Sequence, residues 1–251
     1  MIKLGGSVIT DKSMEYSFKE GVVKRLIQEI KEASTKTKQR VILVHGGGSF
    51  GHPGAKKYGL NTPRPHDTAK GTAEVQYQMR RLNQLIMNIM LENNLWGVSI
   101  PGGLVSTFND GKLESIKTEL FEALLGIGTT PVTFGDVAID RKRDVTICSG
   151  DDLMMGLASL ADRAIFVTDV DGIIKDGNIV KIFTKDMLPL TTEDHKGSER
   201  KIDVTGGMNG KVKNMLKMSS MCQTIVVNGK IEGRLKKVLL GETIICTEVR
   251  R

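Results

Sequence analysis

Several turns in this sequence contain residue types suited to binding phosphate groups. Gly5-Gly6-Ser7 follows the short strand predicted at 2–4, and residues 45–52 (HGGGSFGH) follow the apolar run 41–44. Glycine lets backbone N–H groups approach a phosphate closely, and the start of a following helix favours negative charge. Two such turns at neighbouring strand ends predict a two-sided anion site. Each turn taken alone fits an ordinary tight turn equally well.

Neither glycine turn matches a common nucleotide-binding fingerprint. No Gly-Lys-Ser/Thr follows at Walker A spacing, and neither turn fits G-x-G-x-x-G well.

A third glycine cluster, 205–211, precedes a predicted helix carrying Lys211, Lys213 and Lys217, for which a solvated basic face is the plainer interpretation. Residues 168–173 (TDVDGI) follow a buried apolar run. They fit either a simple Asp-Gly turn or a loop that holds the sugar and base of a nucleotide.

The elements that must position these turns alternate between short strands and amphipathic helices. Apolar residues at helical spacing predict helices within 18–31, 72–92 and 151–161. Short apolar runs predict strands at 2–4, 41–44, 97–100, 130–134, 165–168, 224–227 and 243–245. This alternation predicts an α/β fold, a three-layer αβα sandwich around an open, mostly parallel sheet. Ligands of such sheets bind at the carboxyl ends of the strands, where these turns fall.

The composition excludes several classes of protein. Of the 251 residues 39% are hydrophobic and 26% are charged, which excludes a disordered chain. No apolar run approaches the roughly 18 residues of a membrane span, and no basic, apolar leader opens the chain. Cys148, Cys222 and Cys246 lie far apart, which predicts reduced thiols without a disulfide or zinc role. We therefore expect a cytoplasmic protein with no membrane partner.

The charge balance calls for an anionic partner. Lys and Arg number 36 against 29 Asp and Glu, giving a net charge of +7. Aromatic residues make up only 4%, and no basic stripe carries the stacking aromatics typical of nucleic-acid binding. An anionic small molecule also explains the excess, because a phosphate-filled cleft needs fixed positive charge. Charge alone does not distinguish a nucleic acid from a small anionic molecule. Because stacking aromatic residues are few, we expect no nucleic-acid partner.

In this order, the motifs resemble the amino acid kinase family, whose members transfer the γ-phosphoryl group of ATP to a carboxylate, carbamate or phosphate. The matching stretches span nearly the whole chain: 3–12, 44–53, 135–137, 149–152, 168–173, and 203–208 with Lys211. Within the family, Ser-Phe-Gly-His at 49–52 is typical of the members that phosphorylate isopentenyl phosphate and their close relatives. The resemblance implies a kinase that makes isopentenyl diphosphate for isoprenoid biosynthesis by an alternative mevalonate route.

The resemblance also implies an organisation and a set of partners. Residues 1–148 form an N-terminal lobe that binds the acceptor phosphate, and residues 149–251 form a C-terminal lobe that binds ATP. Mg²⁺ arrives with ATP, and no metal site made of protein side chains is expected. A homodimer is the implied assembly.

Residue roles follow from the same resemblance. The implied catalytic residues are Lys3, Lys12, His52, Asp151 and Lys211. Lys3 and Lys211 approach the β- and γ-phosphates, Lys12 stabilises the transferring group, and Asp151 orients the two domain-bridging lysines. The ATP-binding residues are Lys3, Leu4, Gly5, Gly6, Ser7, Gly48, Asp169, Gly172, Gly207 and Lys211. The acceptor-binding residues are Gly47, His52, Gly150, Val75 and Met79.

Plainer interpretations stay open for several of these residues. Lys12 fits a surface lysine in a polar loop, and Asp151 or Asp152 fits a helix cap. A lone histidine after a glycine turn is more often structural, but His52 could donate an N–H to a phosphate monoester. Val75 and Met79 belong to the apolar face of the predicted helix 72–92, and most such faces are core.

Other functions also stay open. An acetylglutamate kinase would lack Ser-Phe-Gly-His and would require an arginine for its acceptor carboxylate. A fosfomycin kinase shares the histidine. A uridylate kinase is a further alternative. A non-catalytic nucleotide- or anion-binding protein of the same fold would be expected to lose Lys3, Lys12 and Lys211, which are present. The polar loop 191–198 is expected to be mobile, and the sequence does not say whether it closes over ATP.

Overall fold

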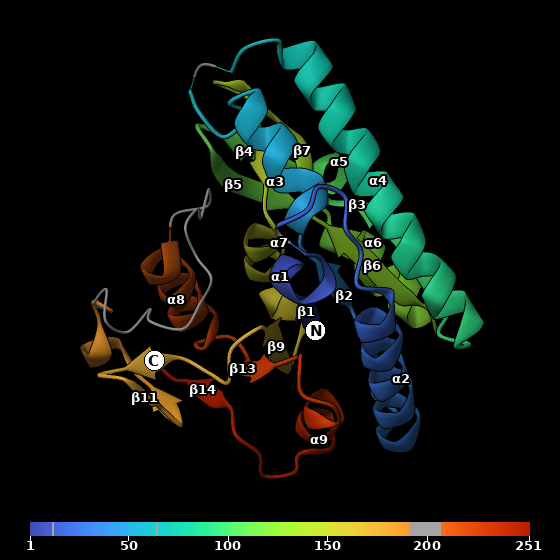
Figure 1. Ribbon diagram of the computed structural model, residues 1–251, viewed down its shortest axis with the longest axis vertical. Coiled ribbons are helices and arrows are strands. Elements are labelled where there is room, and N and C mark those ends of the chain that lie inside the picture. Colours follow the sequence, from blue (N-terminus) through green and yellow to red (C-terminus); the bar gives the residue numbers. More distant parts are fainter. Residues whose placement is uncertain (12, 64, 191–206) are drawn as a thin grey trace.

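The structure is a computed structural model that describes all residues except 12, 64 and 191–206 (Figure 1). Across the described residues the main sheet has eight strands in the order β12-β14-β13-β9-β1-β2-β6-β3. Their bounds are β1 Ile2–Leu4, β2 Leu43–His45, β3 Gly97–Pro101, β6 Thr130–Phe134, β9 Arg163–Thr168, β12 Ile182–Phe183, β13 Gln223–Asn228 and β14 Thr247–Val249. The pairings from β13 to β3 are all parallel, whereas β14 runs antiparallel to β13.

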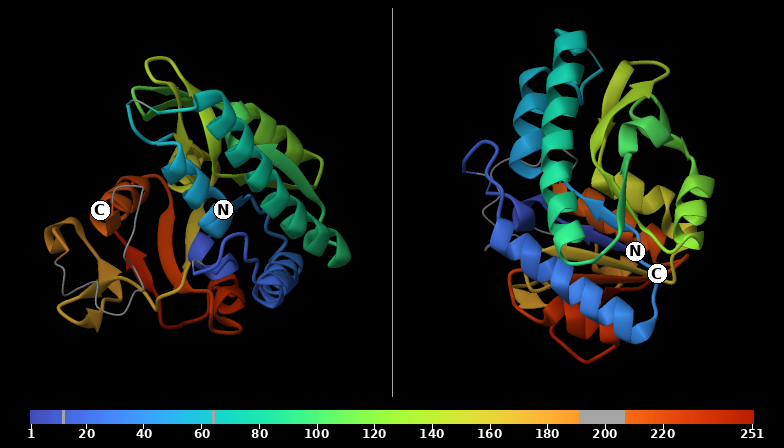
Figure 2. Two further views of the ribbon diagram at one scale, coloured as in Figure 1. Left: turned by 45° about the horizontal axis from the view of Figure 1, so that its top comes forward. Right: turned by 90° about the vertical axis from the view of Figure 1, so that its right-hand side faces the viewer.

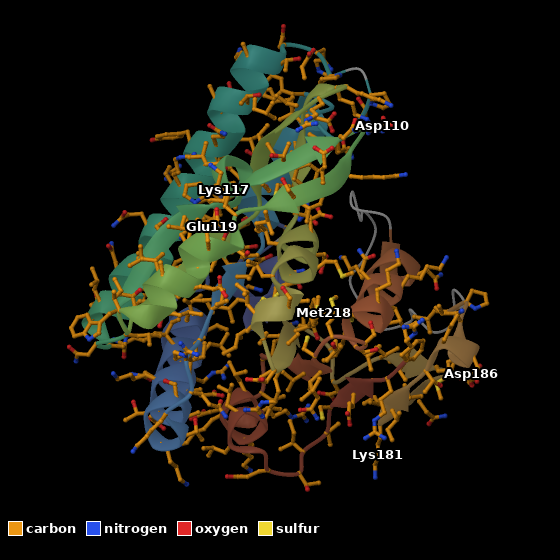
Figure 3. All side chains as sticks on the ribbon, turned by 180° about the vertical axis from the view of Figure 1, so that it is seen from behind. Asp110, Lys117, Glu119, Lys181, Asp186 and Met218 are labelled. Carbon is orange, nitrogen blue, oxygen red and sulfur yellow. The ribbon has the colours of Figure 1, made fainter. Side chains whose placement is uncertain are left out.

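Helices cover both faces of this sheet (Figures 1 and 2). One face carries α2 Glu20–Thr37, α4 Thr68–Glu92 and α9 Arg234–Leu240; the other carries α6 Thr118–Gly126, α7 Gly150–Gly156 and α8 Gly207–Met218. Side chains alternate across a strand, so Val167 of β9 belongs to the same buried cluster as α2, while Phe166 belongs to the cluster of α7 and α8. The predicted αβα architecture is confirmed. Figure 3 shows the second face from behind, with Lys117 and Glu119 at the start of α6 and Met218 at the end of α8.

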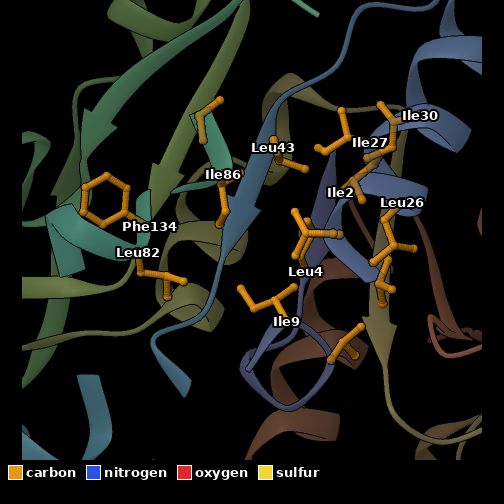
Figure 4. Packing of buried hydrophobic residues seen from close by; sticks show 14 of the residues in the cluster. Ile2, Leu4, Ile9, Leu26, Ile27, Ile30, Leu43, Leu82, Ile86 and Phe134 are labelled. Carbon is orange, nitrogen blue, oxygen red and sulfur yellow. The ribbon is translucent and has the colours of Figure 1, made fainter. Parts of the chain in front are cut away.

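The core fixes β1 at the centre of the sheet although the strand has only three residues. Ile2 and Leu4 are fully buried against Leu26, Ile27 and Ile30 of α2 (Figure 4). Each such burial stabilises the fold by roughly 1.5–3 kcal/mol relative to exposure. Parallel partners on both sides, β2 and β9, complete the backbone pairing of β1. The turn that follows β1 therefore starts from a rigid point.

Short helices follow three of the parallel strands: α1 Gly6–Ile9 after β1, α3 Gly48–Lys57 after β2 and α5 Gly102–Val105 after β3. Two further single turns, η1 Ala158–Leu160 and η2 Lys185–Met187, are 3₁₀ helices. No helix in the described part of the chain combines the length and apolar character that a membrane span requires.

Two smaller sheets were not predicted. The larger comprises β4 Ser106–Asn109, β5 Lys112–Ile116, β7 Asp136–Asp140 and β8 Asp144–Cys148, in the order β5-β4-β7-β8, and β10 Ile174–Lys175 pairs with β11 Asn178–Ile179. The Asp140 carboxylate joins both turns of the larger sheet, because it accepts backbone N–H groups from Asp110, Gly111, Lys142 and Arg143 at 2.7–3.0 Å. These hairpins extend the end of the molecule where β6 passes into β7.

The predicted strand at 243–245 is wrong. β14 begins four residues later, at Thr247, and Ile245 is 56% exposed. Thr247 fixes the position of the strand, because its hydroxyl accepts the N–H of Ile173 at 2.8 Å and donates to the carbonyl of Val180 at 2.6 Å.

Other predicted bounds shift by a few residues. The helix predicted at 18–31 runs from Glu20 to Thr37, the one at 72–92 begins at Thr68, and the strand at 41–44 lies at Leu43–His45. The helix predicted at 151–161 ends at Gly156, and a 3₁₀ turn follows it.

Candidate active site

The glycine turns meet at one edge of the main sheet. Because β1, β2, β6 and β9 run parallel, the turns after them open onto one cleft. The predicted residues that line it are Lys3, Gly5, Gly6, Ser7, Gly47, His52, Val75, Met79, Gly150, Asp151, Asp169, Gly172 and Lys211. The structure thus brings together in one cleft most of the residues that the sequence singled out.

Leu4 and Gly48 are not among the residues that line this cleft. The Leu4 side chain is fully buried in the core, so only its backbone lies near the turns. Gly48 packs behind the lining residues, against Gly6. Gly207 begins α8, and Lys12 lies outside the described residues, as does the polar loop 191–198.

The first two glycine turns touch through their backbones. A Cβ on Gly6 would lie 2.6 Å from the Gly48 nitrogen, and a Cβ on Gly46 would lie 2.9 Å from the Gly6 nitrogen. Gly48 also has φ +48°, a left-handed conformation that favours glycine. Only glycine therefore allows the two turns to form one continuous wall of backbone.

A charged pair links β1 to α7 across the cleft. Lys3 Nζ lies 2.6 Å from Asp151 Oδ1, and these side chains are 14% and 13% exposed. The ammonium also lies 5.7 Å from the ring centroid of Phe166. Gly150 lets the lysine pass, because a Cβ there would stand 3.0 Å from Lys3 Cε. This arrangement holds a cation at the carboxyl end of β1.

The two neighbouring aspartates of α7 differ in role: one caps the helix and the other faces the cleft. Ser149 Oγ accepts the N–H of Asp152 at 3.1 Å, and Asp152 Oδ2 accepts the N–H of Ser149 at 2.9 Å. This is a capping box, so the helix-cap interpretation holds for Asp152. Asp151 instead points to Lys3.

An apolar wall stands beside His52. His52 lies on α3 and lines the cleft. Val75 and Met79 of α4 are almost fully buried, and both reach the same cleft. A Cβ on Gly51 would lie 2.9 Å from Met79 Sδ, and one on Gly54 would lie 2.8 Å from Val75 Cγ2. These glycines let α3 approach α4 closely, which places the histidine next to an apolar surface.

The loop after β9 is held from two sides. Asp171 accepts hydrogen bonds from Asn228 Nδ2 at 2.9 Å and from Arg234 Nη1. Both bonds lower the pKa of the Asp171 carboxyl. Asp169 Oδ1 is buried and has no hydrogen-bond partner among the residues that the structure describes, and Asp169 lines the cleft. A ligand that offers a hydroxyl donor would satisfy this oxygen.

The buried His45 at the end of β2 has a packing role. Its ring stacks on Phe134 at 5.0 Å between centroids, and Nε2 lies 3.3 Å from Nδ2 of Asn83. Burial lowers the pKa of His45 to about 4. The imidazole is therefore neutral at neutral pH and contributes no charge to the cleft.

Asp136 lies in the matching stretch 135–137, and the resemblance assigned it no role. The residue follows Gly135 at the end of β6, lines the cleft and is 2% exposed. Arg80 Nη1 of α4 lies 3.5 Å from Asp136 Oδ2. Burial raises the pKa of Asp136 to about 6, although Arg80 opposes the shift. The available signal was an acid placed directly after a strand and a glycine.

The described residues contain no group of three His, Cys, Asp or Glu side chains that could hold a metal ion. The cationic side chains Lys3 and Lys211 line the same cleft as the glycine turns. The cleft therefore suits the binding of phosphate groups by lysines and backbone N–H groups.

Comparison with known proteins agrees with this geometry. A protein named isopentenyl phosphate kinase from Methanocaldococcus jannaschii is 36% identical over 252 residues, covering 96% of this chain and 95% of that protein. Its namesake from Thermoplasma acidophilum is 33% identical, covering 97% of this chain and 99% of that protein. A solved structure of isopentenyl phosphate kinase superposes with a TM-score of 0.83 at 26% identity, covering 99% of this chain and 98% of the other.

A crystal structure of an isopentenyl phosphate kinase substrate complex superposes with a TM-score of 0.79 at 27% identity, over 99% of both chains. The model of the amino acid kinase family matches residues 1–228. The resemblance that the sequence motifs carry is thus confirmed over nearly the whole chain. The chain belongs to the amino acid kinase family.

Proposed function

We propose that this protein transfers the γ-phosphoryl group of ATP to isopentenyl phosphate, giving isopentenyl diphosphate and ADP. The observation that carries the proposal is one cleft with two different halves. Glycine turns and Lys3 suit phosphates, while Val75 and Met79 form an apolar wall beside His52. The relatives named isopentenyl phosphate kinase match nearly the full length of the chain.

In this reaction an oxygen of the acceptor phosphate forms a bond to the γ-phosphorus as the bond to the β-phosphate oxygen breaks. The acceptor is already ionised, so no strong general base is needed, and catalysis rests on positioning and charge stabilisation. We assign that role to Lys3 and Lys211, with Lys12 at the transferring group. Asp151 orients Lys3 through the 2.6 Å contact.

The acceptor half consists of residues from α3, α4 and α7. Gly47, His52 and Gly150 hold the acceptor phosphate, with His52 donating an N–H rather than acting as a base. Val75 and Met79 contact the hydrocarbon tail. The burial of both side chains at the edge of the cleft supports this assignment.

The nucleotide half is built on the turns after β1 and β9 and on α8. ATP would be bound by Lys3, the Leu4 backbone, Gly5, Gly6, Ser7, Gly48, Asp169, Gly172, Gly207 and Lys211. Mg²⁺ would be held by the phosphate oxygens of ATP. The ion would neutralise phosphate charge there.

We propose two lobes, 1–148 for the acceptor and 149–251 for ATP; the turn after β1 reaches across to the nucleotide, and Gly150 reaches across to the acceptor phosphate. The main sheet joins them, because β1 pairs with β2 on one side and with β9 on the other. We place the reaction in isoprenoid biosynthesis by an alternative mevalonate route, in the cytoplasm. The free cysteines Cys148, Cys222 and Cys246 are consistent with a reducing compartment.

We also propose a homodimer. β3 is an edge strand of the main sheet. Leu91, Trp96 and Ile127 lie on segments that flank β3 and its partner β6, and they are 53%, 55% and 74% exposed. Exposed apolar residues beside a sheet edge are typical of subunit contacts. Sedimentation equilibrium tests this, and a monomer at assay concentration contradicts it.

Release of ADP from Mg-ATP tests the function. Isopentenyl phosphate, fosfomycin, uridylate and acetylglutamate serve as parallel acceptors, and mass spectrometry identifies each product. We expect turnover with isopentenyl phosphate and formation of its diphosphate. Turnover only with another acceptor would overturn the assigned substrate while leaving phosphoryl transfer in place. ATP binding without ADP release for any acceptor would indicate a binding protein.

A further inference from the structure

Two side chains of α4 fasten this helix to the corner between β6 and β7. Gln76 Nε2 donates to the carbonyl of Val137 at 3.2 Å, and Arg80 Nη1 lies 3.5 Å from Asp136 Oδ2. Arg80 Nη1 also donates to the Gln76 carbonyl at 3.0 Å, which holds the guanidinium along the helix. Gln76 and Arg80 are four residues apart and therefore lie on one face of α4. We call these contacts to residues 136 and 137 the clamp.

The corner that receives the clamp is fixed from other directions. The N–H of Gly135 donates to the carbonyl of His45 at 3.2 Å, which ties the corner to β2. The backbone of Gly103 in α5 lies against the Val137 carbonyl so closely that no Cβ would fit. The N–H of Val137 donates to Asp136 Oδ1 at 2.9 Å. The clamp thus fixes the position of α4 relative to a rigid point at the edge of the cleft.

The same two turns of α4 carry the apolar wall. Val75 and Met79 immediately precede Gln76 and Arg80, and both line the cleft with Asp136. A Cβ on Gly47 or Gly51 of the His52 segment would lie 3.1 or 2.9 Å from Met79 Sδ. A displacement of α4 therefore moves the apolar wall and the segment that carries His52 together. The clamp sets how far this wall stands from residues 135 and 136.

We propose that Gln76 and Arg80 are positioning residues that set the width of the acceptor slot, and thereby select a short isoprenoid tail over a longer one. This inference rests on the proposed function and deepens it. An apolar pocket discriminates one methylene by about tenfold or more, so a small displacement of its wall matters. In this proposal a longer tail fits only when α4 moves away from the corner. With the clamp in place, that movement must break both contacts.

The test compares the variants Arg80→Met and Gln76→Leu with the control Arg141→Met. Methionine keeps an apolar stem but removes the guanidinium. Arg141 serves as the control because it follows the far end of β7, is 65% exposed and pairs with Glu114. The acceptors are isopentenyl phosphate and the ten-carbon geranyl phosphate. We expect the ratio of their kcat/KM values to shift about tenfold toward geranyl phosphate in both clamp variants, with the KM for ATP within about twofold of wild type. The control should keep the wild-type ratio.

An unchanged ratio would overturn the inference, as would a KM for ATP that rises in parallel with the KM for the acceptor. The rate of amide hydrogen exchange in α4 tests the clamp independently of enzyme turnover. Residues 75–83 should exchange about tenfold faster in Arg80→Met than in Arg141→Met. Faster exchange in a protein that phosphorylates neither acceptor would refute the proposed function and keep the clamp. Unchanged exchange would refute the clamp even in an active kinase.

Discussion

Lys3 and Asp151 are 148 residues apart in the sequence, yet Lys3 Nζ lies 2.6 Å from Asp151 Oδ1. One residue belongs to the central strand β1 and the other to the first turn of α7. Their contact spans the boundary between the proposed lobes. A cation at the end of a rigid strand is well placed to meet phosphate, and the carboxylate determines where its long side chain rests.

Substitution of Asp151 by Asn should release Lys3 from this position. Asparagine keeps the size of the side chain but loses the charge that holds the ammonium. We expect kcat to fall by about 10- to 100-fold, because misplaced catalytic groups cost rates of that order. Asp152→Asn is the matched control, since Asp152 caps α7 and should affect the stability of the fold more than kcat. Equal kcat values for wild type and Asp151→Asn would contradict the role of the pair.

His52→Ala should raise the KM for isopentenyl phosphate and lower turnover. A hydrogen bond to a charged group contributes about 1.5–3 kcal/mol, so the KM should rise by about tenfold or more. His52→Gln keeps an N–H donor and should recover part of the loss. His66→Ala is the control, because His66 is exposed and lies outside the cleft lining. Unaltered kinetics in His52→Ala would remove the main reason for assigning this acceptor.

Lys211→Ala should chiefly impair the use of ATP. Lys211 lines the cleft from α8, opposite β1. Loss of one charge that stabilises the transferring group typically costs about 10²-fold in kcat, and the KM for ATP should rise as well. Lys213→Ala on the same helix is exposed and should behave as wild type. If both variants lose activity equally, the effect comes from net charge rather than from a specific contact.

How far the sequence predicts this molecule differs between its elements. The strands of the main sheet are recognisable because strands buried on both faces carry short apolar runs, as residues 164–167 of β9 do. The small sheet was missed because β5 (KLESI) is exposed along most of its length and carries no apolar alternation. The run at 243–245 has the composition of a strand, but Thr247 fixes β14 through its hydrogen bonds to residues 173 and 180.

The residues of the site also differ in how far the sequence predicts their arrangement. The glycine turns were predictable from local sequence, because each follows a buried strand. The pairing of Lys3 with Asp151 came only from the family resemblance, since no local pattern relates residues so far apart. The clamp was not predictable at all. Gln76 and Arg80 carry ordinary helix residue types, and their contact with Asp136 and Val137 arises only when α4 crosses the end of β6.

Gly6→Ala should disturb both stability and ATP binding. The new Cβ would stand 2.6 Å from the Gly48 nitrogen, and backbone atoms cannot yield as a flexible side chain can. We expect a loss of about 1–3 kcal/mol in the free energy of unfolding, together with a higher KM for ATP. Gly21→Ala in α2 is the control, because a Cβ there meets nothing within 4 Å. That change should stabilise the fold by about 0.5–1 kcal/mol.

The buried carboxyl of Asp136 should make stability depend on pH in an unusual direction. Its pKa rises from 3.8 to about 6 on folding, so the folded state binds the proton more tightly than the unfolded state does. Stability from this group is therefore fully present below about pH 4 and is lost as the pH rises through about 6. About two pKa units correspond to roughly 3 kcal/mol at most. His45 acts in the opposite sense, because its pKa falls to about 4 and acidification below 6.5 destabilises the fold.

A comparison of wild type with Asp136→Asn isolates this group, because His45 titrates equally in both proteins. Asparagine fills the same space without ionising. Urea unfolding from about pH 4 to about pH 7 should show the free energy of unfolding of the wild type falling relative to the variant by up to about 3 kcal/mol. A difference that stays constant across this range would mean that Asp136 remains ionised throughout. The contact with Arg80 would then outweigh the burial of the carboxyl, and the clamp would be a full ion pair at every pH tested.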